Sequence, residues 1–182
     1  MVPITGRLLV ASPMLGDPNF SRTVVLMLAH GDEGALGLVL NRSSDVDVSA
    51  VLPDVWRDVA PEPRVLFVGG PVASDSVIGL ARVDGEGEGF VPMTRGLATV
   101  DLERTPASIG KGVTTARVFA GHAGWGPGQL EGELEVPGWI VVDAEDSDAF
   151  TDDPDGLWRA VLARQPGRLG WLANFPDSLL SN

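Results

Sequence analysis

The chain of 182 residues carries a formal net charge of −12 at pH 7 and contains no cysteine. The lack of cysteine excludes disulfide bonds, thiolate metal sites and cysteine nucleophiles, and the negative charge disfavours sequence-independent binding to nucleic-acid phosphates. The length fits a single domain over residues 1–182, and no apolar run approaches the ~18 residues that cross a bilayer. The N-terminus lacks the basic start and apolar core of a signal peptide. We therefore expect an acidic cytoplasmic protein that does not bind membranes.

The first part of the chain is rich in β-strand patterns. Residues 6–13 form an apolar run that ends at a proline and predicts a strand, and residues 14–20 contain turn formers. The nearly unbroken apolar runs over 24–30 and 35–42 predict two buried strands. Because residues 31–34 are turn formers, we expect these two strands to form a hairpin.

The middle of the chain alternates short apolar runs with glycine-rich turns. Residues 45–52 fit either a strand or a helical face, and we favour a short helix that ends before the next proline. Residues 65–68 and 96–100 are predicted strands. Residues 76–83 and 90–91 predict a second hairpin around a flexible acidic tip.

The last third combines strands with helices. Thr105, followed by a proline, is a predicted helix N-cap. The β-branched and aromatic residues of 114–120 predict a strand that leads into a glycine-rich loop, and 139–143 predicts another strand. Residues 129–134 fit one helical turn. Asp153 and the proline after it begin a helix to about residue 165, whose apolar face holds Leu157, Trp158, Val161 and Leu162. The tail is too apolar to hang free and is expected to pack, with Trp171, Leu172, Phe175, Leu179 and Leu180.

The glycine-rich loop at 121–132 reads Gly-His-Ala-Gly-Trp-Gly-Pro-Gly-Gln-Leu-Glu-Gly. Successive N–H groups in such turns can form an anion site, but the loop has no lysine and no P-loop pattern. The alternative, which we favour, is that the glycines let a buried Trp125 fold tightly onto the sheet while Gln129 and Glu131 cap the backbone. The ligand-binding candidates in the loop are Gly124, Trp125, Gly126, Gly128 and Gln129.

A second polar cluster consists of Asp17, Arg22, Asn41 and Arg42, in the early loop and at a strand exit. The planar fork of arginine suits a carboxylate or phosphate ligand, and it suits an internal Asp or Glu equally well. In so acidic a chain the internal partner is favoured. We expect one of the two arginines to lie near the glycine loop, so that both clusters share one cleft.

The candidates for acid–base catalysis are His122 and Glu131. A metal site would need His30 and His122 to meet, with Asp32, Glu33 or Glu131 as a third ligand. The chain has no HExxH motif and no Gly-x-Ser-x-Gly elbow of a serine hydrolase. We therefore expect no metal and no cofactor, and we favour a protein that is not an enzyme.

The glycine block at 121–131 resembles the bacterial AlgH/YqgE family, and further blocks agree with it in the same order across essentially the whole chain. These blocks are residues 6–13, Asp17-Pro18, Phe20, Arg22, 24–26, 34–42, 69–72, Trp139 and Trp158. The resemblance implies a single α/β (α+β) domain in which a bifurcated, mainly β sheet folds into a pseudo-barrel with flanking helices. It implies no established enzymatic activity, and some members carry a transcriptional-regulator label from effects on alginate production.

Two positions depart from the family pattern. Ser43 stands where a proline usually follows Asn-Arg, which removes a restraint on the backbone. His122 stands where a tyrosine is expected, so a role that needs histidine would not be a family property.

These patterns lead us to expect a non-catalytic binding or regulatory protein of the AlgH/YqgE type, acting on transcription indirectly through a protein or small anionic ligand. The alternative is an enzyme that acts on a small anionic metabolite at residues 121–132. A direct DNA-binding regulator ranks third because of the negative charge.

Overall fold

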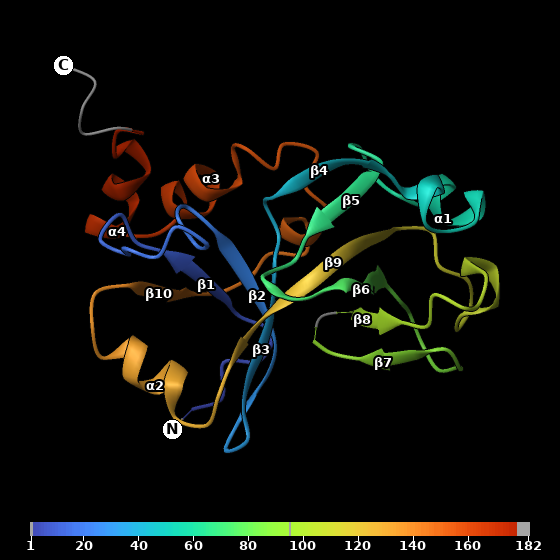
Figure 1. The fold of residues 1–182 in the computed structure, drawn as a ribbon, viewed down its shortest axis with the longest axis horizontal. Helices are drawn as coiled ribbons and strands as arrows, with labels where there is room; N and C mark the ends of the chain where they lie inside the picture. Colours follow the sequence, from blue (N-terminus) through green and yellow to red (C-terminus); the bar gives the residue numbers. More distant parts are fainter. Residues whose placement is uncertain (1, 95, 178–182) are drawn as a thin grey trace.

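The computed structural model describes residues 2–94 and 96–177, which form a strongly curved sheet with short helices around it (Figure 1). The strands are hydrogen-bonded in the order β10-β1-β2-β3-β9-β6-β8-β7, and β5 pairs with β9 and carries β4. The expected mainly β half-barrel with few helices is confirmed. The strands are β1 Leu8–Ala11, β2 Val24–Gly31, β3 Gly34–Val39, β4 Ser43–Asp47, β5 Val65–Val68, β6 Val72–Arg82, β7 Phe90–Pro92, β8 Leu97–Val100, β9 Ala116–Trp125 and β10 Trp139–Val142.

The first three strands and β10 make up one half of the sheet. β2 and β3 pair antiparallel with Gly31 opposite Gly34, which confirms the first predicted hairpin. Alternate side chains of β1 enter different core clusters: Leu8 packs in one and Leu9 in the other. Because both faces of β1 and of the first half of β2 are covered, these segments are apolar without a break.

The second predicted hairpin is wrong. Strand β6 pairs with β8 and β9, and β7 pairs only with β8 among the described strands. After residue 83 the chain runs past the position of β8 and forms β7 at the edge of the sheet. It then turns back as β8, which lies between β7 and β6, so the tight hairpin joins β7 to β8. The residues of the acidic tip could equally serve this longer connection, so local turn signals did not distinguish the two pairings.

The helices are short. They are η1 Val48–Ala50, α1 Asp54–Asp58, η2 Pro106–Ser108, α2 Gln129–Leu134, η3 Asp148–Phe150, α3 Leu157–Ala163, α4 Arg168–Trp171 and η4 Leu172–Asn174, where η marks a 3-10 helix. None of them, in the described parts of the chain, has the length and apolar character to span a membrane.

The expected helix at 45–52 is half wrong, because its first residues belong to β4 and only 48–50 are helical. The carboxylate of Asp47 accepts the Ser49 N–H at this junction, which starts the 3-10 turn. Thr105 makes no side-chain cap, although Pro106 does begin a helix. The last predicted helix exists as α3, with its four apolar side chains buried. Its predicted start at Asp153 is wrong: residues 154–156 form a turn, in which Asp153 accepts the Gly156 N–H at 3.1 Å.

The expected packing of the tail is confirmed for two of its residues and is wrong for Trp171. Leu172 and Phe175 pack against the main core, whereas Trp171 is exposed. Leu179 and Leu180 lie outside the described residues.

A buried arginine ties β9 to two distant loops. The Arg117 guanidinium is 1% exposed, lies over the ring of Phe67 and donates to the carbonyls of Thr151 and Glu62 at 2.7 and 3.0 Å. Burial lowers the pKa of Arg117 to about 10, and the negative charge of Asp152 partly opposes this. The residue therefore acts as an internal cross-link.

Strand β9 joins the two halves of the sheet, and it contains the glycine-rich segment (Figure 1). Its first part pairs with β6 and β5, and its last part, from Ala123 to Trp125, pairs with β3. The predicted strand end before residue 121 is therefore wrong: residues 121–125 are strand, and His122 lies inside it. Only 126–128 form a turn before α2.

Close backbone contact explains why this strand needs glycine. Gly121 has a φ of 71°, and a β-carbon added there would lie 2.5 Å from the Gly70 carbonyl oxygen. A β-carbon on Gly70 would in turn collide with the carbonyl of His122. The two chain segments can pass each other only without side chains at these points.

We predict that Gly121→Ala lowers the free energy of unfolding by about 2–4 kcal/mol, because it adds a steric collision to the ~1–2 kcal/mol cost of a left-handed backbone. Gly128→Ala is the matched control. Gly128 has a φ of 74° and nothing within 4 Å of an added β-carbon, so only the backbone cost applies. Urea denaturation measures both, and equal losses would contradict the close-contact explanation.

Candidate functional site

Three residues of the predicted polar cluster, Arg22, Asn41 and Arg42, line a pocket at the end of the sheet nearest α3. The pocket has a volume of about 180 Å³. It is lined by Ser21, Arg22, Asn41, Arg42, Asp155, Trp158, Arg159 and Asp177. We call this the arginine pocket. Its three arginines come from the loop before β2, the exit of β3 and helix α3.

Asn41 fixes the backbone on which Arg22 stands. Its Nδ2 donates to the Arg22 carbonyl at 2.8 Å, and its Oδ1 accepts the Val24 N–H at 2.9 Å. Arg22 itself has a φ of 54°, a left-handed conformation that non-glycine residues rarely adopt. The side-chain amide thus supplies the hydrogen bonds that hold this turn in place.

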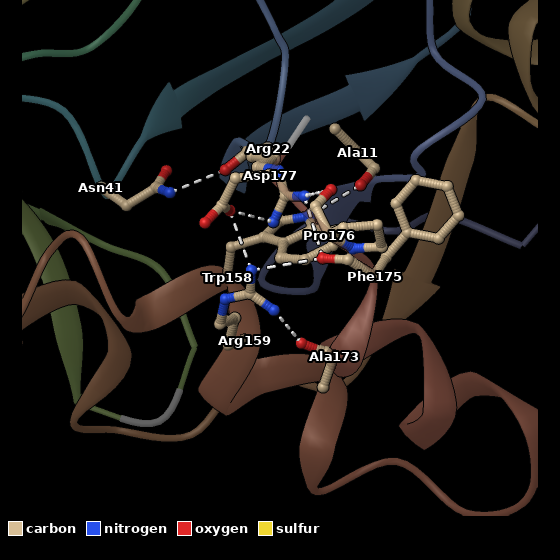
Figure 2. Close-up of polar contacts among 9 residues, drawn as sticks. All are labelled: Ala11, Arg22, Asn41, Trp158, Arg159, Ala173, Phe175, Pro176 and Asp177. Atoms are coloured by element: carbon tan, nitrogen blue, oxygen red, sulfur yellow. Dashed lines mark hydrogen bonds and ion pairs between the residues drawn. The ribbon is translucent and has the colours of Figure 1, made fainter. Parts of the chain in front are cut away.

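Two guanidinium groups lie against the indole of Trp158 (Figure 2). The guanidinium carbons (Cζ) of Arg22 and Arg159 are 4.5 and 5.9 Å from the centroid of the Trp158 ring. At these distances a cation is attracted to an aromatic face. Trp158 is 2% exposed, and its Nε1 donates to the Ala11 carbonyl at 2.8 Å. The indole is therefore held in a fixed position, and both guanidinium groups pack against it.

Arg42 holds the loop that precedes β2. It donates to the carbonyls of Asn19 and Ser21. Burial lowers the pKa of Arg42, and the charge of Asp17 partly offsets the effect. Arg42 remains a cation at neutral pH because a guanidinium titrates far above it.

The glycine segment lines a different cavity, which we call the aromatic pocket. It has a volume of about 190 Å³ and is lined by Leu15, Asp17, Phe20, Gly124, Trp125, Gln129, Glu133, Val136, Gly138 and Trp139. The expected single cleft is therefore corrected: Asp17 lies with the glycine segment, while Arg22, Asn41 and Arg42 lie in the arginine pocket. The loop at 17–22 contributes to both pockets and separates them.

Three rings and one carboxylate build the aromatic pocket. Phe20 stacks on Trp125 with centroids 6.1 Å apart and meets Trp139 edge-on at 5.5 Å. Glu133 Oε2 accepts both indole N–H groups, at 3.0 and 2.9 Å. Trp125 is buried, as expected. The carboxylate thus orients the two indoles, and its own lone pairs are engaged by the protein.

Gln129 caps the turn before α2, as expected from the sequence. Its Oε1 accepts the Gly126 N–H at 3.0 Å, and its Nε2 donates to Glu133 at 3.0 Å. Gly124, Gly126 and Gly128 are exposed around this turn. These residues are consistent with a structural turn at the rim of the aromatic pocket.

The histidine contacts differ from the expected ones. Glu131 Oε1 is 2.9 Å from Nε2 of His30, whose Nδ1 accepts the Ile4 N–H at 3.3 Å. The His30 side chain is only 3% exposed. His122 instead lies opposite Val72 in the sheet. Within residues 2–94 and 96–177, no group of three His, Cys, Asp or Glu residues could hold a metal ion.

Sequence reasoning missed Arg159, Asp177, Phe20 and Glu133 as parts of these pockets. Arg159 follows Trp158 in α3, and its position at the edge of an apolar helix face was the available signal. No local pattern indicated that it meets Arg22 and the C-terminal segment.

We predict that His30→Ala raises the pKa of Glu131. The hydrogen bond from the backbone N–H of Glu131 lowers the pKa of its carboxyl group most, and the hydrogen bond from His30 lowers it further, while burial opposes both effects. The ionised carboxylate thus contributes stability above its ordinary pKa, and this is lost as the pH falls through the lowered folded-state pKa. NMR titration of the carboxyl carbon measures the pKa.

His122→Ala is the control and should leave the Glu131 titration unchanged. A shift in His122→Ala as large as that in His30→Ala would show that the observed pairing is wrong.

The comparisons with known proteins match nearly the whole chain. A family model described as AlgH-like matches residues 8–170. UPF0301 proteins from Streptomyces avermitilis and Streptomyces coelicolor are 49% and 51% identical, each match covering 96% of this chain and 93% of the relative. The names of these relatives state no activity.

Two solved structures share the fold. A Corynebacterium diphtheriae protein has a TM-score of 0.85 at 33% identity and covers 96% of this chain and 94% of its own. The AlgH protein of Pseudomonas aeruginosa has a TM-score of 0.71 at 28% identity, covering 97% and 96%. The resemblance noted from the sequence is confirmed, and the chain belongs to the AlgH-like family.

Proposed function

We propose that the chain is a non-catalytic binding protein of the cytoplasm whose arginine pocket takes an anionic group from a small ligand or a protein partner. The observation that carries the proposal is the convergence of Arg22, Arg42 and Arg159 on one pocket in a chain of net charge −12. Arginines in such a chain are expected to be spread among the many acids. Three arginines against the two carboxylates of Asp155 and Asp177 leave the lining with one net positive charge, which attracts anions.

The geometry of the pocket suits carboxylate or phosphate recognition. Two guanidinium groups are held on a rigid indole, and one of them stands on a left-handed backbone that Asn41 stabilises. Groups fixed in advance lose little entropy when they bind an anion. A carboxylate, that of Asp177, already bridges Arg22 and Arg159 at 3.0 and 2.8 Å.

Catalysis at the glycine segment has no comparable support. The acid–base pair expected there needs Glu131 beside His122, but Glu131 is hydrogen-bonded to His30. We also propose that any effect on transcription is indirect, because a net charge of −12 opposes the approach of DNA phosphates.

We predict that Arg159→Ala weakens the binding of succinate and inorganic phosphate at least about tenfold, because one charge-assisted contact is lost. Binding is followed by NMR through the Trp158 indole N–H. Arg57→Ala is the matched control, since Arg57 is similarly exposed and pairs with Asp47 outside the pocket. Unchanged affinity in Arg159→Ala, or equal losses in both variants, would contradict the proposed site.

A further inference from the structure

The chain's own C-terminal segment lies in the mouth of the arginine pocket (Figure 2). Arg159 donates to the carbonyls of Ala173 and Phe175, and Arg22 donates to those of Phe175 and Pro176. Both guanidinium groups also contact Oδ1 of Asp177. The segment leaves the 3-10 helix η4 at Phe175, and the two arginines hold it through main-chain carbonyls and one carboxylate.

This mode of binding depends little on side-chain identity. Carbonyl oxygens are common to every peptide, and an arginine fork can donate to any of them. Among the polar contacts with the two arginines, only the carboxylate of Asp177 is specific to a residue type. Another acidic peptide could therefore make the same contacts.

The ion pairs that Asp177 forms with Arg22 and Arg159 are weak. The Asp177 side chain is 84% exposed, and its arginine partners are 27% and 39% exposed. Exposed ion pairs of this kind contribute little to stability, because water and salt screen them. Phe175, in contrast, packs against the main core. The acidic end can leave while the aromatic anchor stays.

From these contacts we infer that the arginine pocket recognises an acidic peptide segment of a partner protein, and that Pro176 and Asp177 compete internally for the contacts of its acidic end. The inference rests on the proposed function and specifies its ligand. A free phosphate would satisfy the guanidinium charges but would leave unmade the contact that the Pro176 carbonyl makes with Arg22. An acidic peptide satisfies both.

The charge of the whole chain adds selectivity. The many carboxylates of the chain repel an acidic partner from most of its surface. The arginine pocket therefore determines where and in which orientation such a partner docks. A partner must displace Asp177 from the two arginines before it can bind. A partner that makes fewer contacts with the pocket than the internal segment does therefore binds more weakly.

The test uses the full chain and the synthetic peptide acetyl-Ala-Asn-Phe-Pro-Asp-amide, which copies residues 173–177. Asp177→Asn removes the internal carboxylate and leaves the main-chain contacts of residues 173–176 as they are. We expect this variant to bind the peptide about three- to tenfold more tightly than the unchanged chain. A peptide with asparagine at its last position should bind the variant about tenfold more weakly. Calorimetry and the Trp158 indole resonance measure both.

Asp143→Asn is the control, because Asp143 forms a similarly exposed ion pair with Arg7 outside the pocket. It should leave peptide affinity unchanged. Equal affinity of the unchanged chain and Asp177→Asn overturns the internal competition. Binding of phosphate without binding of peptide overturns the peptide ligand and leaves the anion-binding function standing. Failure of Asp177→Asn to bind either probe overturns the proposed function itself.

Discussion

The close backbone contact between Gly69-Gly70 and Gly121-His122 is the constraint on which the rest of the fold depends. The Gly69 N–H donates to the Ala120 carbonyl, and the Gly69 carbonyl accepts the Val39 N–H, both at 2.8 Å. One glycine thus bridges β3 and β9 where the sheet divides. Because side chains are excluded there, β9 can leave β6 and join β3. The glycine-rich block is accordingly the element that closes the half-barrel.

The arginine pocket lies beside this contact, since the Val68 N–H donates to the Arg42 carbonyl at 2.7 Å. The β2–β3 pair brings Asn41 beside the loop before β2, and α3 lies over the sheet so that Trp158 reaches the Ala11 carbonyl. Residues far apart in sequence therefore meet on rigid elements. The strained backbone of Arg22 is retained where several hydrogen bonds determine it, a combination that is common at binding sites.

Strong local patterns predicted the buried strands, the first hairpin and α3, because apolar runs and turn residues act over short distances. The second hairpin failed because the same turn residues suit a longer connection. The polar candidates Arg22, Asn41 and Arg42 do lie together, since both strand ends were visible in the sequence. The pairing of Glu131 with His30 and the meeting of Arg159 with Asp177 depend on contacts between distant segments, for which one sequence carries no local signal.

The most direct measurement of the central claim is a crystal structure of the chain with the acidic peptide bound. We expect a peptide carboxylate between Arg22 and Arg159 above the Trp158 indole, with Asp177 displaced into solvent. A peptide bound elsewhere, with Asp177 still paired to both arginines, would contradict it.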